Sequence, residues 1–371
     1  MVFKNWKKIN ELVVSFRGLS IVGISDIVSS AISSVFWLYM ASIMGADNYG
    51  QVSYLLAIAG ISSTLASLGV QNTITVYTAK NIAIQPPLYL ITLVSSCITA
   101  LIVFFTFNNN AISLYVVTVV ISGLAIAEIL GRRNYKSYAK YIIIQKILMI
   151  VLTIPLYHKI GTNGIIIGIG VSFLVYSIKI YQVFRTTRID FSIIKPRFSF
   201  MLNTYVIDVL SAFNGSVDKI IIAPILGFSS LGNYQLGIQF LTMAYVLPNI
   251  ISKYLIPEDA SGFSNKKLKK VIIGISILLS ILGIILSPII VPVLFPKFNN
   301  TVQVIQITSL AIVPYTISAI YASKLLGMEN SRLVLYGSII YSIVQILAIL
   351  TLGKVFGISG MAMAYVLSTT S

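Results

Sequence analysis

The chain has 371 residues, of which 57% are hydrophobic and 10% charged, and its mean hydropathy is +0.93. Soluble domains carry about 25% charged residues, so this composition excludes a soluble protein. The net charge of +16 comes from basic residues that lie between hydrophobic stretches. This distribution indicates membrane topology and contact with anionic lipid, and it argues against nucleic-acid binding.

The chain has one cysteine, Cys97, and one histidine, His158. A single cysteine excludes internal disulfides and a cysteine-based zinc site. One cysteine and one histidine are also too few ligands for a transition-metal site. The sequence shows no nucleophile–base pair and no glycine-rich phosphate loop. We therefore expect a protein that is not an enzyme and that uses no cofactor.

Residues 1–19 are basic and carry apolar side chains at helical spacing, among them Trp6, Ile9 and Phe16. This pattern predicts an interfacial amphipathic helix that leads into the first membrane span.

Runs of about 20 apolar residues, the length of a bilayer-spanning helix, recur along the whole chain. They predict an all-α polytopic membrane protein with about twelve spans. The predicted spans are 20–44, 51–77, 87–107, 111–131, 141–158, 163–183, 203–226, 232–256, 269–292, 301–326, 333–352 and 358–371. The last is short, so we expect a final helix that this sequence truncates.

A basic, proline-containing stretch, residues 184–202, separates six predicted spans from the next six. We expect an N-terminal lobe over 20–183, a cytoplasmic linker over 184–202 and a C-terminal lobe over 203–371. Because each half has an even number of spans, both halves enter the membrane in the same sense. This predicts two parallel six-helix repeats related by an axis along the membrane normal.

Two internal matches support a duplication. Residues 21–52 match residues 203–234 at a constant offset of 182, and residues 161–164 match residues 357–360. At the first offset the following residues coincide: Asp26 with Asp208, Ser29 with Ser211, Trp37 with Lys219, Gly45 with Gly227, and Gly50 with Gly232. Two matches, one near each end of the half, support duplication better than either alone.

The distribution of lysine and arginine predicts the orientation. With the N-terminus in the cytoplasm, only Lys159, Lys297 and Lys354 lie on the outer side, while Lys146 and Lys219 lie within spans. All other basic residues then face the cytoplasm, as the positive-inside rule requires. We expect a multi-pass protein of the plasma membrane with both termini in the cytoplasm.

Polar residues follow one side of the first predicted span and of its counterpart in the second half. An ionisable group within a membrane helix is costly and marks a functional site by default. Serines at such positions often serve helix packing alone, so the carboxylates carry most of the argument. The candidate residues for a substrate- or ion-binding cleft are Asp26, Ser30, Ser33, Trp37, Lys146, Asp208, Ser211, Asp218 and Lys219.

Asp218 and Lys219 lie deepest, about 23 Å from the cytoplasmic surface if residues 203–226 form one helix with a rise of about 1.5 Å per residue. Adjacent residues on a helix do not face each other, so we expect each to have another partner. Lys146 could pair with Asp218. Alternatively, Lys146 and Lys219 offer positive charge to an anionic headgroup. Glu128 and Arg132, four residues apart, predict a local ion pair.

Three stretches carry a resemblance to a known family. Residues 40–80, residues 216–237 (SVDKIIIAPILGFSSLGNYQLG) and residues 357–368 (GISGMAMAYVLS) resemble the Wzx-type polysaccharide flippases of the MOP superfamily. The resemblance implies two six-helix lobes in a V, as in MATE transporters, around a cavity that opens alternately to each side. It also implies transport of a polyprenyl-linked sugar from the cytoplasmic to the outer leaflet.

The leading hypothesis is therefore a flippase for a polyprenyl-(pyro)phosphate-linked oligosaccharide, used in cell-surface glycan biosynthesis. Its expected partners are the lipid-linked glycan, membrane lipids and glycan-assembly enzymes. The alternative is a cation-coupled multidrug or metabolite antiporter that uses Asp26 or Asp218 for ion coupling. A third hypothesis is a membrane scaffold without transport activity.

Overall fold

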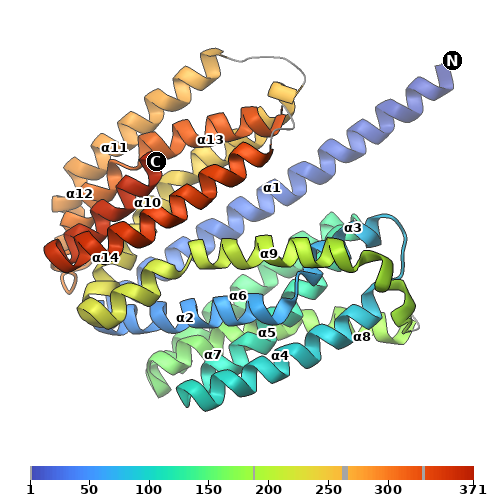
Figure 1. The fold of residues 1–371 in the computed structure, drawn as a ribbon, viewed down its shortest axis with the longest axis horizontal. Helices are drawn as coiled ribbons and strands as arrows, with labels where there is room; N and C mark the ends of the chain where they lie inside the picture. Colours follow the sequence, from blue (N-terminus) through green and yellow to red (C-terminus); the bar gives the residue numbers. More distant parts are fainter. Residues whose placement is uncertain (1, 187–188, 261–265, 328–330) are drawn as a thin grey trace. The chain divides into compact units, whose positions relative to one another are not determined.

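The computed structural model describes residues 2–186, 189–260, 266–327 and 331–371, and over these ranges the chain is helical with short connections. The α-helices are α1 (Val2–Met44), α2 (Ala46–Ser67), α3 (Val70–Ala79), α4 (Gln85–Phe107), α5 (Asn110–Gly131), α6 (Tyr135–Ile160), α7 (Thr162–Phe173), α8 (Ser177–Thr186), α9 (Phe198–Asn214), α10 (Val217–Ala260), α11 (Lys266–Leu294), α12 (Thr301–Ser309), α13 (Ile312–Gly327) and α14 (Ser331–Thr370) (Figure 1). Short 3-10 helices follow α7 and precede α9. The prediction of an all-helical protein is confirmed.

Eight helices within the described ranges are long and apolar enough to cross a membrane, and ten if each of two bent pairs counts as one span. Two of the eight, Phe191–Val246 and Leu333–Thr370, are far longer than a bilayer needs. They are interrupted at Gly227 and Gly357, where the backbone leaves the helical region. Both breaks fall at predicted span boundaries, and a total of twelve crossings stays a prediction.

Three predicted spans are not single straight helices. The span expected over 51–77 consists of α2 and α3, bent by 50°, and the span expected over 301–326 consists of α12 and α13, bent by 42°. The span expected over 203–226 is interrupted where α9 ends at Asn214 and α10 begins at Val217. In the first case the cause is local, because Leu68 and Gly69 both have left-handed backbones, which a continuous helix does not allow.

The first helix is continuous from Val2 to Met44. The side chains expected to make residues 1–19 amphipathic lie outside the described residues, so an interfacial position for this stretch stays a prediction.

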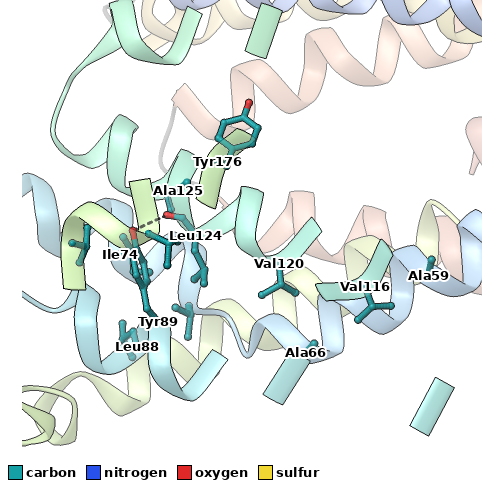
Figure 2. Packing of buried hydrophobic residues seen from close by; sticks show 14 of the residues in the cluster. Ala59, Ala66, Ile74, Leu88, Tyr89, Val116, Val120, Leu124, Ala125 and Tyr176 are labelled. Carbon is teal, nitrogen blue, oxygen red and sulfur yellow. Dashed lines mark hydrogen bonds between the residues drawn. The ribbon is translucent and has the colours of Figure 1, made fainter. Parts of the chain in front are cut away.

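The chain divides into two compact units, one of residues 1–36 and 55–216 and one of residues 37–54 and 217–371. The helices of the first unit pack around α5, which contacts α3, α4, α7 and α8. Figure 2 shows part of its core, where Val116, Val120 and Leu124 of α5 are fully buried. The phenol of Tyr89, from α4, reaches across to the carbonyl oxygen of Leu124 at 3.3 Å.

In the second unit α10 packs against α12, α13 and α14. Its core contains the fully buried Leu231 and Tyr234 and a stacked pair of rings, Tyr245 and Tyr315, whose centroids are 3.7 Å apart. Aromatic stacking adds to the apolar contact that holds α10 against α13.

The two internal sequence matches have matching backbone structures. Gly161 and Gly357 both join two helices through positive φ angles of 65° and 59°. Three residues later, a Cβ on Gly164 would collide with the carbonyl oxygen of Leu156, and a Cβ on Gly360 would collide with that of Leu352. Only glycine allows both the turn and this close return of the next helix. The GxxG matches therefore encode the same tight helix–helix corner twice.

The other match gives a reciprocal contact inside the second unit. A Cβ on Gly50, in α2, would collide with the carbonyl oxygen of Phe228, in α10, and a Cβ on Gly232 would collide with that of Ala46. Positions 46 and 228, like 50 and 232, are 182 residues apart, the offset of the sequence match. Small residues permit such close backbone approach between membrane helices.

Candidate functional site

A polar cavity lies between α3 and α9 in the first unit. It encloses about 410 Å³ and is lined by Thr64, Ser67, Gln71, Asn72, Asp208, Ser211 and Ala212. The amide nitrogen Nδ2 of Asn72 lies 3.1 Å from Oδ1 and 3.3 Å from Oδ2 of Asp208 and donates to this carboxylate. We call this cavity, with its seven lining residues, the Asp208 pocket.

The left-handed turn before α3 brings α9 into place. A side chain at Gly69 would collide with the backbone of Met201 and Tyr205, and the hydroxyl of Thr204 donates to the carbonyl oxygen of Gly69 at 3.0 Å. The absence of a Cβ at position 69 therefore lets α9 approach closely enough for Asp208 to meet Asn72.

Asp208 has no cationic partner among the residues that the structure describes. Its hydrogen-bond partner is an amide, and the pocket combines the carboxylate with a second amide and hydroxyl groups. Such a set offers donors and acceptors side by side, with the Asp208 carboxylate as its one ionisable group. It can hydrogen-bond a neutral polyhydroxylated ligand, and its carboxylate can bind a cation or a proton.

Asp26, the predicted counterpart of Asp208, lies in a different environment. Its Oδ1 accepts a hydrogen bond of 2.6 Å from the phenol of Tyr138, in α6. Ser29 and Ser25 donate to backbone carbonyls of their own helix, and Ser30 is exposed. Within the described residues, Ser25 and Ser29 therefore bond the backbone and not the carboxylate.

Ser33 and Trp37 complete the candidate residues of the first helix. The Ser33 hydroxyl is buried and makes no hydrogen bond within the described part of the chain. Trp37 falls in the second unit, where its ring meets the edge of Tyr49 with centroids 6.0 Å apart. Whether either residue contacts a substrate stays a prediction.

Asp218 and Lys219 contact each other at the start of α10. Nζ of Lys219 lies 3.3 Å from Oδ1 of Asp218, and the same oxygen accepts the backbone N–H of Lys219 at 2.8 Å. The expectation that each residue also has a separate partner stays a prediction. Because α10 begins at Val217, Asp218 occupies its first turn, where a carboxylate bonds unpaired amides and the lysine side chain folds back.

The same break separates the candidate residues of the second half. Asp208 and Ser211 lie on α9 in the first unit, whereas Asp218 and Lys219 lie on α10 in the second unit. Lys146 is half-buried on α6 in the first unit, and its role as a ligand for a headgroup stays a prediction.

The predicted ion pair at the end of α5 is confirmed. Nε of Arg132 lies 2.6 Å from Oε1 of Glu128, and the phenol of Tyr89 donates to Oε2 at 3.1 Å. Glu128 and Tyr89 are buried, whereas half of the Arg132 side chain is exposed.

Sequence reasoning missed Gln71 and Asn72, which complete the Asp208 pocket, and Tyr138, which bonds Asp26. The sequence did contain a signal for Gln71 and Asn72, because two adjacent amide side chains lie inside the predicted span 51–77 and buried amides need hydrogen-bond partners. Tyrosine is common in membrane helices and this chain has 21, so Tyr138 carried no comparable signal.

The described residues form a helical fold with at least eight candidate spans, and carboxylates lie inside those spans, which defines the class as a multi-pass membrane protein. Solved structures share this fold. An inward-facing multidrug resistance MATE transporter of the MOP superfamily has a TM-score of 0.64 at 15% identity, covering 92% of this chain and 91% of that one. The lipid II flippase MurJ in an inward closed conformation has a TM-score of 0.61 at 16% identity, covering 97% and 85%.

The sequence identifies the family more narrowly. Residues 39–295, more than half of the chain, match the polysaccharide biosynthesis protein family, and the chain belongs to this family. No curated protein matches the chain by sequence.

Proposed function

We propose that this transporter moves a polyprenyl-(pyro)phosphate-linked oligosaccharide from the cytoplasmic to the outer leaflet of the plasma membrane, by alternating access. The observation that carries the proposal is the Asp208 pocket, in a chain that belongs to a polysaccharide biosynthesis family. The N-terminus faces the cytoplasm in this proposal, and the transported glycan serves cell-surface polysaccharide assembly.

The chemistry of the pocket suits a sugar. Each sugar hydroxyl both donates and accepts a hydrogen bond, so carboxylate and amide groups close together can bond adjacent hydroxyls. Asn72 holds the Asp208 carboxylate through two contacts and thereby fixes its orientation. The volume of about 410 Å³ lies in the range of small-ligand sites, about 300–1,000 Å³, and can admit one or two sugar rings.

The first experiment is lipid mass spectrometry on the gently purified protein. Co-purified polyprenyl-phosphate or polyprenyl-pyrophosphate glycans support the proposal and identify the sugar. If only bulk phospholipids are found, and proteoliposomes then fail to translocate the cell's own lipid-linked glycan, the proposal is wrong.

The role of the pocket is tested with Asp208→Asn and Asn72→Ala in the translocation assay. Because one hydrogen bond to a charged group contributes about 1.5–3 kcal/mol, each variant should lower apparent affinity for the glycan about tenfold or more. The matched control is Asn203→Ala, which removes an exposed amide from the same helix, outside the pocket. Equal transport by all variants at equal membrane levels would remove the pocket from the mechanism.

A cation-coupled antiporter is the second candidate, and a specific observation favours it. Asp26 and Asp208 both have neutral partners, Tyr138 and Asn72, so either carboxylate is available to a proton or a metal cation. Asp218, in contrast, is already paired with Lys219. Drug–proton exchange in vesicles that Asp26→Asn abolishes would favour the antiporter over the flippase.

A further inference from the structure

A second polar cavity lies at the end of the first unit where α3 passes into α4 and α5 passes into α6. It encloses about 740 Å³ and is lined by Thr78, Ala79, Asn81, Ile82, Ala83, Gln85, Gly131, Arg132 and Arg133. We call it the Arg132–Arg133 pocket. It shares no residue with the Asp208 pocket.

Packing between the helices fixes both walls of this pocket. The amide of Gln85 donates to the hydroxyl of Thr78 at 2.7 Å and ties the start of α4 to the end of α3. A Cβ on Gly131 would lie 2.7 Å from Cβ of Thr78 and 2.9 Å from the carbonyl oxygen of Thr75, so α5 approaches α3 as closely as a glycine permits. Buried contacts therefore fix the helix ends that carry the lining residues.

One guanidinium in the pocket is held in a fixed orientation. The buried carboxylate of Glu128 bonds Nε of Arg132 at 2.6 Å, and the buried phenol of Tyr89 bonds the other carboxylate oxygen. No other bond from this guanidinium is found within the described ranges of the chain. Its terminal nitrogens, which carry four of the five N–H donors, therefore remain for a ligand.

The second arginine occupies a backbone position that disfavours it. Arg133 has φ +55° directly after the end of α5, where helices usually place glycine because other L-residues pay a steric cost of about 1–2 kcal/mol in the left-handed region. Asn81, on the opposite loop, also has a left-handed backbone, with φ +59°. Asparagine adopts this region readily, so Arg133 is the residue of the cavity whose backbone is disfavoured.

The charge of the pocket is positive. Glu128 offsets Arg132, while Arg133 has no carboxylate partner among the described residues and no Asp or Glu lines the cavity. Planar guanidinium groups match the tetrahedral oxygens of a phosphate through paired N–H donors. Hydroxyl and amide groups of Thr78, Asn81 and Gln85 can bond the remaining phosphate oxygens.

We propose that the Arg132–Arg133 pocket is a binding site for a phosphate group, presented by the headgroup of an anionic lipid or by a soluble phosphate compound. It lies at the end of the first unit that the positive-inside pattern assigns to the cytoplasm. The site shares no residue with the Asp208 pocket, so the inference does not rest on the proposed function.

The test uses the full chain purified in detergent. Native mass spectrometry measures retention of phosphatidylglycerol against phosphatidylcholine, and calorimetry measures binding of inorganic pyrophosphate. Arg133→Gln should lower the affinity for whichever probe binds the wild-type chain, phosphatidylglycerol or pyrophosphate, about tenfold or more. This is the effect of losing one charged hydrogen-bonding group. The matched control is Arg185→Gln, an exposed arginine of α8 outside the pocket, which should change binding less than twofold.

Two further arms make the result decisive. Pyrophosphate that displaces phosphatidylglycerol from the wild-type chain identifies a site open to soluble phosphates, whereas lipid retained in its presence identifies a headgroup site. Arg133→Gly should raise the unfolding temperature, because glycine relieves the left-handed strain, and yet lose the phosphate probe. Binding lost equally in the Arg133 and Arg185 variants, or absent from the wild-type chain with both probes, would overturn the proposal.

Discussion

The reciprocal contact between α2 and α10 makes a prediction in which two alanine substitutions on one helix have opposite effects. Gly50 and Gly60 both lie inside α2. A Cβ on Gly50 would collide with the backbone of Phe228, whereas a Cβ on Gly60 would find no heavy atom within 4 Å. The two substitutions therefore differ only in what the added methyl group meets.

The magnitudes follow from two opposing effects. Replacing an interior helix glycine with alanine stabilises a helix by about 0.5–1 kcal/mol at either site. At Gly50 the added carbon meets a carbonyl oxygen, which no rotamer change can move aside, so overpacking of about 1–3 kcal/mol or more opposes that gain. Gly60→Ala should raise the free energy of unfolding. The free energy of unfolding of the Gly50→Ala variant should be about 1–3 kcal/mol lower than that of the Gly60→Ala variant.

The assay is equilibrium unfolding in mixed micelles, with thermal melting in detergent as a second measurement. Gly232→Ala should behave like Gly50→Ala, because its added methyl group meets the carbonyl oxygen of Ala46. If Gly50→Ala and Gly232→Ala stabilise the protein as much as Gly60→Ala does, the helices are not in contact there and the reasoning is refuted.

Three other substitutions test local features. Gly227→Ala should lower the free energy of unfolding by about 1–3 kcal/mol, because φ +83° with ψ 168° is open only to glycine; unchanged melting would contradict this backbone. Tyr138→Phe removes the 2.6 Å bond to Asp26 and should lower the free energy of unfolding by about 1.5–3 kcal/mol, the value of a hydrogen bond to a charged group; unchanged thermal melting would contradict this contribution. Hydrogen bonds from the Ser192 hydroxyl and then its amide lower the pKa of Asp190 below its ordinary value. The 3-10 turn at Phe191–Ile193 should therefore persist at neutral pH and be lost only as the pH falls through that lowered pKa, and Asp190→Asn, observed by NMR of the Ser192 amide, should remove the transition.

Apolar length and turn chemistry made much of the fold predictable from the sequence. The spans expected over 87–107 and 111–131 agree with α4 and α5 within two residues. The glycines at 45, 161, 227 and 357, which the internal matches singled out, all have positive φ. Composition and repeated glycines are local properties, and they need no knowledge of tertiary contacts.

The interruptions were harder to predict because the hydrophobic pattern continues through them. Nothing in the hydropathy of 51–77 marks Leu68, and a left-handed leucine there is stabilised by what surrounds it and not by its own preference. The same limit applied to 203–226, where the break before Val217 divides the predicted span between α9 and α10. Continuity of an apolar run predicts membrane residence but does not predict a straight helix.

The three candidate carboxylates were predicted because burying a charge in a membrane is costly. In the structure each of them contacts a different kind of group. Asp26 meets a phenol, Asp208 an amide, and Asp218 its neighbouring lysine. Asp26 and Asp208 coincide in the sequence match, yet their partners Tyr138 and Asn72 come from non-equivalent helices. Long-range pairing of this kind depends on tertiary packing, which a single sequence does not encode locally.

The reciprocal collision geometry of Gly50 with Phe228 and of Gly232 with Ala46 has an evolutionary consequence. A contact in which each copy of a segment presents the same surface to the other is the isologous interface of a two-fold symmetric dimer. If the two segments descend from one duplicated segment, a half-length ancestor would have carried a self-complementary surface at these positions. A single mutation there would have altered both sides of the crossing at once, whereas in the present chain each side can change separately.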